Sequence, residues 1–164
     1  MNLKALLITH GPCTGAELLA LTGSEVLPLW QTCRTQPGIA TQRAGHRYLR
    51  LDKRIEGYAR LSPSIRREFL TYTVIGTHEQ REAVAARCRA MQEEFARISH
   101  DKRAFARDVI ERIVDVNPHR EQLQAHLCCM IAGDVTYGMA HTVERPEPST
   151  GRPVRGSDLD LIFV

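Results

Sequence analysis

The 164-residue sequence has no hydrophobic run long enough to cross a membrane. Its longest apolar stretches, "LCCMIA" and "LDLIFV", fall far short of the roughly 20 residues that a transmembrane helix needs. The first residues, "MNLKALLITHGPCTG", also lack the apolar length and the cleavage site of a secretory signal. We therefore expect a cytoplasmic protein that does not act at a membrane.

Paired cysteines are also missing. The sequence has five cysteines, an odd number, and no C-x-x-C spacing, while its seven histidines are not clustered. This pattern argues against a disulfide framework and against a structural zinc site. We expect the cysteines to serve as small buried apolar residues. They are Cys13, Cys33, Cys88, Cys128 and Cys129.

Charge is balanced overall but uneven along the chain. Apolar residues make up 43% and charged residues 25%, which is usual for a soluble globular protein, and the net charge is only +3. Between Arg34 and Arg67, however, nine basic residues stand against two acidic ones, Asp52 and Glu56. A local basic block of this kind suggests contact with an acidic partner such as nucleic acid.

The first third of the chain predicts three short helices and a hairpin. Helical spacing of leucines and turn signals indicate helices over residues 2–10, 14–23 and 24–36; Thr14 and Glu17 form a capping-box pattern and Gly23 ends the second helix. After Pro37 the period becomes alternating, so "IATQR" and "RYLRL" read as two strands joined by "AGH".

Three short helices followed by a basic hairpin resemble a winged helix-turn-helix domain, which we assign to residues 1–60. The resemblance implies that the third helix enters the DNA major groove and that the hairpin contacts the phosphate backbone. The implied nucleic-acid-binding residues are Gln31, Thr32 and Arg34 in the helix, and Arg43, Arg47 and Arg50 in the hairpin.

Residues 61–117 predict connecting helices. "SIRREFLTYTV" reads as the first. The second is "THEQREAVAARCRAMQEEFARIS", which we expect to end at Ser99 or Asp101. Its apolar stripe consists of Val84, Cys88, Met91 and Phe95. The third is "DKRAFARDVIERIVDV", with Phe105, Val109 and Ile113 expected on its buried face.

The segment "HREQLQAHLCCMIAG" allows two interpretations. It could be one helix with Leu123, Leu127 and Met130 on a stripe, or a short helix followed directly by a strand. We favour the strand because of the motif that comes later. The segment "VERPEPSTGRPVRGS" lies between this strand and that motif, and its prolines and glycines predict an exposed loop.

That later motif is a pair of aspartates, Asp158 and Asp160, at the start of the apolar run "LDLIFV". In a strand, side chains at i and i+2 project from the same face, so the two carboxylates would stand side by side. Hard oxygen ligands of this kind suit Mg²⁺, which commonly binds one or two carboxylates together with substrate phosphates. The pair is therefore a candidate metal site.

An apolar strand ending in glycine, "LCCMIAG", followed by "GSDLDLIFV", resembles the polymerase-beta-like nucleotidyltransferase superfamily. The resemblance implies a turn at Gly133 whose backbone approaches a nucleoside triphosphate, with Asp134 and Ser157 beside it. It also implies that Asp158 and Asp160 hold Mg²⁺ for in-line phosphoryl transfer. The family adds a third carboxylate on a later strand, which the sequence up to Val164 does not supply, so we expect this chain to be inactive.

Taken together, the sequence predicts an α+β, mostly helical protein. Residues 1–60 would form the winged helix, 61–117 connecting helices, and 118–164 the first part of a nucleotidyltransferase α/β fold. The expected function is metal-dependent nucleotidyl transfer in the complete fold, directed by a nucleic-acid-binding domain, with a homo-oligomer allowed. The alternatives are a non-enzymatic DNA-binding regulator and a protein-interaction domain. The sequence leaves the enzymatic question and the acceptor substrate open.

Overall fold

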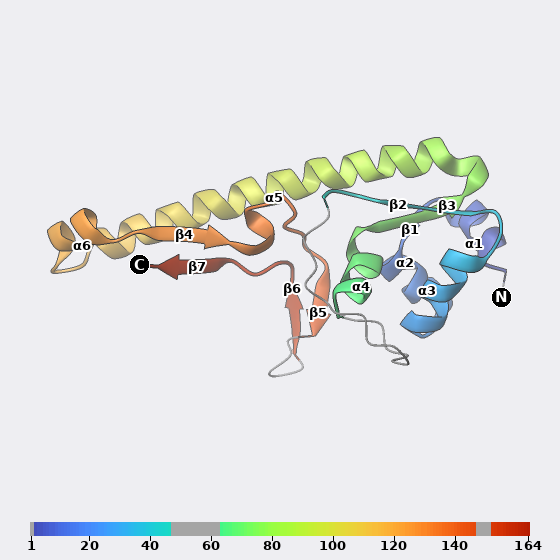
Figure 1. Cartoon of the computed structure of the whole chain (residues 1–164), viewed down its shortest axis with the longest axis horizontal. Coiled ribbons are helices and arrows are strands. Elements are labelled where there is room, and N and C mark those ends of the chain that lie inside the picture. Colours follow the sequence, from blue (N-terminus) through green and yellow to red (C-terminus); the bar gives the residue numbers. More distant parts are fainter. Residues whose placement is uncertain (1, 47–62, 147–151) are drawn as a thin grey trace. The chain divides into compact units, whose positions relative to one another are not determined.

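The computed structural model describes residues 2–46, 63–146 and 152–164 (Figure 1). The chain is an α+β protein, mostly helical with small antiparallel sheets, as the sequence predicts. It divides into two compact units, residues 1–91 and 92–164, which are described separately below. Within the described ranges, no helix is both long and apolar enough to cross a membrane.

The N-terminal unit begins with the three helices that the sequence predicts. They are α1 (Leu3–His10), α2 (Gly15–Thr22) and α3 (Val26–Thr35), with the short strand β1 (Cys13–Thr14) before α2. Thr14 and Glu17 form the expected capping box, in which each side chain binds the other residue's backbone N–H. Gly23 ends α2 in the left-handed conformation, with φ 61°.

Apolar side chains from these helices and the neighbouring strands form the core of this unit. Its buried members are Leu3, Leu7, Cys13, Leu18, Leu29, Cys33, Ile39, Phe69 and Ile75. Burial raises the pKa of the Cys33 thiol to about 11. The expectation of buried cysteines is confirmed for Cys13, Cys33 and Cys88 but is wrong for Cys128, which is exposed.

The sheet of this unit contains the first strand of the predicted hairpin. "IATQR" does form a strand, β2 (Ile39–Arg43), but its partner is β3 (Thr73–Thr77), in antiparallel register from Ile39 opposite Thr77 to Arg43 opposite Thr73. The predicted second strand, "RYLRL", lies outside the described residues. β1 pairs with the other edge of β3, which gives the order β1-β3-β2.

The helix predicted over residues 64–74 is therefore only partly correct. The chain forms α4 (Pro63–Arg67) and one π-helical turn, η1 (Glu68–Tyr72), and then becomes β3. β3 contains four β-branched residues in five, and its Val74 and Ile75 are fully buried. Burial of these branched side chains in the sheet favours a strand over continuation of the helix.

A single helix, α5 (Arg81–Asp115), replaces the second and third predicted connecting helices, after the 3₁₀ turn η2 (His78–Gln80). The predicted end at Ser99 or Asp101 is wrong because Ser99 is buried and its Oγ accepts a hydrogen bond from Ala140 N, at 3.0 Å. A tertiary contact thus satisfies a polar side chain that suggested a helix end.

The continuity of α5 also sets which of its residues are buried. Of the expected stripe, Val84, Cys88 and Phe95 are buried and Met91 is half-buried. Beyond Ser99 the stripe keeps the same phase and continues through Ala106 and Val114. The buried face predicted for the third helix is wrong at Phe105 and Ile113, which are 62% and 54% exposed, whereas Val109 is half-buried.

The C-terminal unit contains a short helix and two antiparallel strand pairs. Its elements after α5 are α6 (Arg120–His126), β4 (Cys129–Ala132), the 3₁₀ turn η3 (Gly133–Val135), β5 (Glu144–Pro146), β6 (Pro153–Arg155) and β7 (Asp160–Phe163). β4 pairs with β7, and β5 with β6. The helix-then-strand interpretation is confirmed, whereas the expected exposed loop contains the β5–β6 pair. A small core forms where Ile131 and Leu159 pack on buried Ile98, Val135 and Ala140.

Arg87 joins α5 to the start of α2 in the N-terminal unit. Its guanidinium binds both carboxylate oxygens of Glu17, at 2.6 and 2.7 Å, and donates to the backbone oxygen of Pro12. Partial burial raises the pKa of Glu17. The hydrogen bond from Thr14 N and the charge of Arg87 lower it by more, so the pKa of Glu17 lies below its ordinary value. Ionised Glu17 therefore stabilises the fold.

We expect Arg87→Ala to lower the stability of the N-terminal unit by about 1 kcal/mol, or Tm by about 4 to 8 °C, because a half-exposed charged pair is lost. Because folding depresses the Glu17 pKa, this loss should be largest above pH 4.5 and shrink as pH falls below that value. Thermal unfolding followed by circular dichroism measures it. The control is Arg89→Ala, at an exposed position on the same helix. An equal effect of both changes at pH 7 would contradict the assignment.

Candidate functional site

The pairing of β4 with β7 brings the predicted glycine and one of the two aspartates together. The last residue pair is Ala132 with Asp160, and Gly133 follows immediately. Gly133 has φ 73°, and a Cβ placed there would lie 2.5 Å from Asp160 Oδ2. Glycine is thus favoured both by the left-handed backbone and by the close carboxylate. The family resemblance implies that these two residues belong to one site.

Asp134 and Ser157 are in direct contact, although 23 residues separate them. Ser157 Oγ donates to Asp134 Oδ2 at 3.0 Å and accepts from His141 N at 3.1 Å. Ser157 is 5% exposed, so this hydroxyl is part of the interior of the unit. The Asp134 carboxylate is therefore held by a hydrogen bond to the turn that precedes Asp158.

Polar side chains of α5 hold both halves of this site, and the sequence analysis missed them. Lys102 Nζ donates to the backbone oxygen of Ser157 at 2.7 Å, and Arg103 donates to that of Val135 at 3.4 Å. Ser99, one turn earlier, binds Ala140 N. The feature of the sequence that could have identified them is the position of Ser99 and Lys102 on the buried stripe of α5, because a buried polar side chain needs a hydrogen-bond partner.

The two aspartates of the D-x-D motif have different local structure. β7 begins at Asp160, while Asp158 precedes the strand, so the expectation that both lie in one strand is wrong. Both side chains are exposed. Within residues 2–46, 63–146 and 152–164, no three His, Cys, Asp or Glu side chains gather closely enough to hold a metal ion. Mg²⁺ binding stays a prediction.

The predicted nucleic-acid-binding residues of α3 are all exposed. The Thr32 hydroxyl donates to the backbone oxygen of Pro28, at 2.9 Å, so its donor is used within the helix. The Arg34 guanidinium lies over the Trp30 ring, 4.8 Å from its centre. Gln31 and Arg34 are therefore the polar groups on this helix best placed to reach a ligand.

Arg43 has a different environment from the one that the sequence suggested. Its guanidinium forms an ion pair with Glu68 at 2.9 Å, with the Arg43 side chain only 16% exposed, and lies 5.8 Å from the centre of the Tyr72 ring. This internal pairing competes with any phosphate contact. Arg47 and Arg50, the other two predicted hairpin residues, are outside the described residues.

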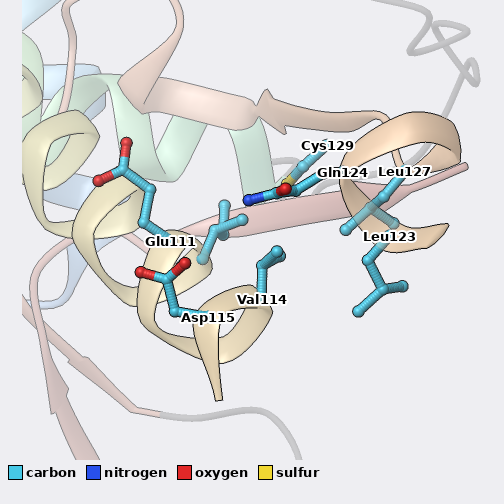
Figure 2. A pocket seen from close by; sticks show the side chains of 8 residues that line it. Glu111, Val114, Asp115, Leu123, Gln124, Leu127 and Cys129 are labelled. Atoms are coloured by element: carbon cyan, nitrogen blue, oxygen red, sulfur yellow. The ribbon is translucent and has the colours of Figure 1, made fainter. Parts of the chain in front are cut away.

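An apolar groove in the C-terminal unit was not predicted. It has a volume of about 360 Å³ and lies between the end of α5, α6 and β4 (Figure 2). Val114, Leu123 and Leu127 supply much of its apolar lining, and the carboxylates of Glu111 and Asp115 also lie along it. None of the predicted site residues lines this groove.

Comparisons with protein-family models, with curated proteins and with solved structures gave no match.

The site depends on the backbone turn at Gly156, directly before Ser157. Gly156 has φ 86°, and a Cβ there would lie 2.6 Å from the backbone oxygen of His141, whereas Gly138 has φ 66° and open space around the same position. We expect Gly138→Ala to cost about 1 to 2 kcal/mol from the left-handed backbone alone. Gly156→Ala should cost a further 1 to 3 kcal/mol, roughly, from the clash.

Urea unfolding, followed by circular dichroism, measures the loss of stability in both variants, each of which adds one methyl group at a positive-φ glycine. Equal destabilisation by the two variants would contradict the described turn.

Proposed function

We propose that the C-terminal unit is a polymerase-beta-like nucleotidyltransferase module that binds Mg²⁺ and a nucleoside triphosphate at Gly133, Asp158 and Asp160. The observation that carries this proposal is the direct pairing of β4 with β7, which sets the glycine turn against the Asp160 carboxylate. The sequence motif alone did not require these two segments to be neighbours, 27 residues apart in the chain.

The chemistry of the site is compatible with this role. A positive-φ turn at Gly133 lets backbone N–H groups approach phosphate oxygens without a side chain in the way. The exposed carboxylates of Asp158 and Asp160 are hard ligands of the kind that Mg²⁺ prefers. The Asp134 carboxylate would repel a triphosphate, and its hydrogen bond from Ser157 reduces that repulsion.

Nucleotidyl transfer demands more than binding. In-line transfer uses two metal ions to hold the attacking and leaving oxygens, and correct positioning alone contributes about 7 to 11 kcal/mol in such reactions. The described residues supply no group of three metal-ligating side chains. We therefore infer weak Mg²⁺ binding and no transfer by the chain as it stands.

We expect the chain to bind Mg²⁺ more tightly in the presence of a nucleoside triphosphate, and Asp160→Asn to weaken this binding at least about tenfold because a charged ligand is lost. Isothermal titration calorimetry measures the affinity, with Asp108→Asn, an exposed carboxylate on α5, as the control. Equal binding by Asp160→Asn and the parent chain would refute the site. Incorporation of labelled nucleotide that is lost in Asp160→Asn would confirm the site but refute the inferred inactivity.

A second candidate function concerns the N-terminal unit, as a winged helix-turn-helix domain that binds nucleic acid. The features that support it are three helices followed by the antiparallel β2–β3 pair, and the exposure of Gln31, Thr32 and Arg34 on α3. With few base-reading groups on α3, binding would depend mainly on phosphate contacts and show little sequence preference. A chain that binds nucleic acid but has no catalytic activity would be a non-enzymatic regulator.

We expect the chain to bind duplex DNA weakly and with a steep salt dependence. Arg34→Ala should lower the slope of log affinity against log salt by about 0.9, the value for one phosphate contact. Arg43→Ala should leave the slope unchanged and lower the thermal stability, because Arg43 is paired with Glu68. Fluorescence anisotropy across salt concentrations measures the slope, and exposed Arg89→Ala is the control. Identical slopes for Arg34→Ala and the parent would exclude α3 from the interface.

A further inference from the structure

The two faces of the β4–β7 sheet have different surroundings. On one face, Ile131 packs against the small core around Ile98 and Val135. On the other, Met130 and Ile162, which are directly opposite each other, are both 47% exposed, and Val164 is 73% exposed. Phe163, on the same face as Ile131, is also 54% exposed. A two-stranded sheet is marginally stable by itself, and this one exposes apolar side chains.

The two edges of this sheet also differ. Cys128 and Val164 exchange both backbone hydrogen bonds, at 2.9 Å, so by antiparallel alternation the backbone groups of Leu161 and Phe163 point away from β4. No strand in the described part of the chain pairs with β7 on that side. On the outer edge of β4, by contrast, Ile131 O accepts a hydrogen bond from Thr136 Oγ1 at 3.0 Å.

β7 lacks the devices that normally protect an edge strand. It has no proline or lysine, its register with β4 runs without a bulge, and its one charge is Asp160 at the first position. The side chains of the remainder, Leu161 to Val164, are all apolar. Such an edge is a template for pairing with another strand.

We propose that the outer edge of β7 pairs antiparallel with β7 of a second copy of this chain, which forms a continuous sheet β4-β7-β7-β4 across a two-fold axis. Leu161 of each copy would exchange backbone hydrogen bonds with Phe163 of the other. At the axis, Ile162 would then face Ile162 of the second copy as a non-hydrogen-bonded pair, in which the side chains are closest. This contact would make the exposed apolar faces of the two copies continuous.

This register keeps the two Asp160 side chains apart. Asp160 of each copy falls opposite Val164 of the other, so the two carboxylates lie at opposite ends of the paired segment. The register with Leu161 opposite itself would instead place each Asp160 directly against Ile162. A two-fold interface needs a self-complementary surface, and the segment from Asp160 to Val164 provides one. This inference is independent of the proposed metal site.

The unmodified chain provides the first test, with reducing agent present because Cys128 is exposed. Light scattering after size exclusion should show a dimer that dissociates on dilution. Amide hydrogen exchange followed by NMR should show that Leu161 and Phe163 gain protection in the dimer, whereas Ile162, which points toward β4, does not. A monomer at every concentration, or a dimer in which the Leu161 and Phe163 amides stay unprotected, would overturn the proposal.

Charge reversal at the axis is the second test. Ile162→Lys and Ile162→Glu should each weaken the dimer at least about tenfold, because like charges face each other, and a mixture of the two should restore it. Met130→Lys is the matched control, since Met130 has the same exposure on the same face but lies one strand away from the axis.

Dissociation by Met130→Lys as strong as by Ile162→Lys would mean that the sheet face, not the edge, binds the second copy. Failure of the mixture to dimerise would exclude the register with Ile162 at the axis. If either variant at position 162 loses its fold by circular dichroism, the hydrogen-exchange pattern of the unmodified chain decides the question.

Discussion

The antiparallel pairing of β4 with β7 is the constraint on which the C-terminal unit depends. It alone places Gly133 next to Asp160, because the register brings Ala132 opposite Asp160 and the chain turns at the next residue. The same pairing directs Ile131 into the small core and leaves Met130 and Ile162 on the open face. A shift of one residue would exchange these two faces and remove the carboxylate from the glycine turn.

α5 fixes this pairing from one side. The side chains of Ser99, Lys102 and Arg103 bind backbone groups near both strands of the candidate site, which ties the glycine turn and the segment before Asp158 to one rigid helix. Helical spacing of three and four residues puts these groups within about one turn. A site built only on loops would lack these bonds to a helix. The helix that the sequence predicted as a connecting element therefore determines the geometry of the site.

The sequence predicted the elements whose signals are local. The capping box at Thr14 and Glu17 and the stripe from Val84 to Phe95 depend on neighbouring residues, and both are present. The errors arose where distant contacts decide. Ser99 is buried by a bond to Ala140, β3 forms because its branched residues enter a sheet, and Arg43 is drawn inward by Glu68. Of the candidate site, the shared location of the glycine and the aspartate was implied by the family resemblance, whereas the supporting groups of α5 were not predicted.

The proposed metal site and the proposed strand pairing use the same strand without competing for the same atoms. Self-pairing uses the outward backbone groups of Leu161 and Phe163, whereas a metal ion would bind the carboxylate of Asp160. In the paired sheet, the two Asp160 carboxylates lie at opposite ends, each next to an apolar Val164 of the other copy. Partial removal of water there would strengthen the attraction between carboxylate and cation. A dimer would therefore carry two separate sites.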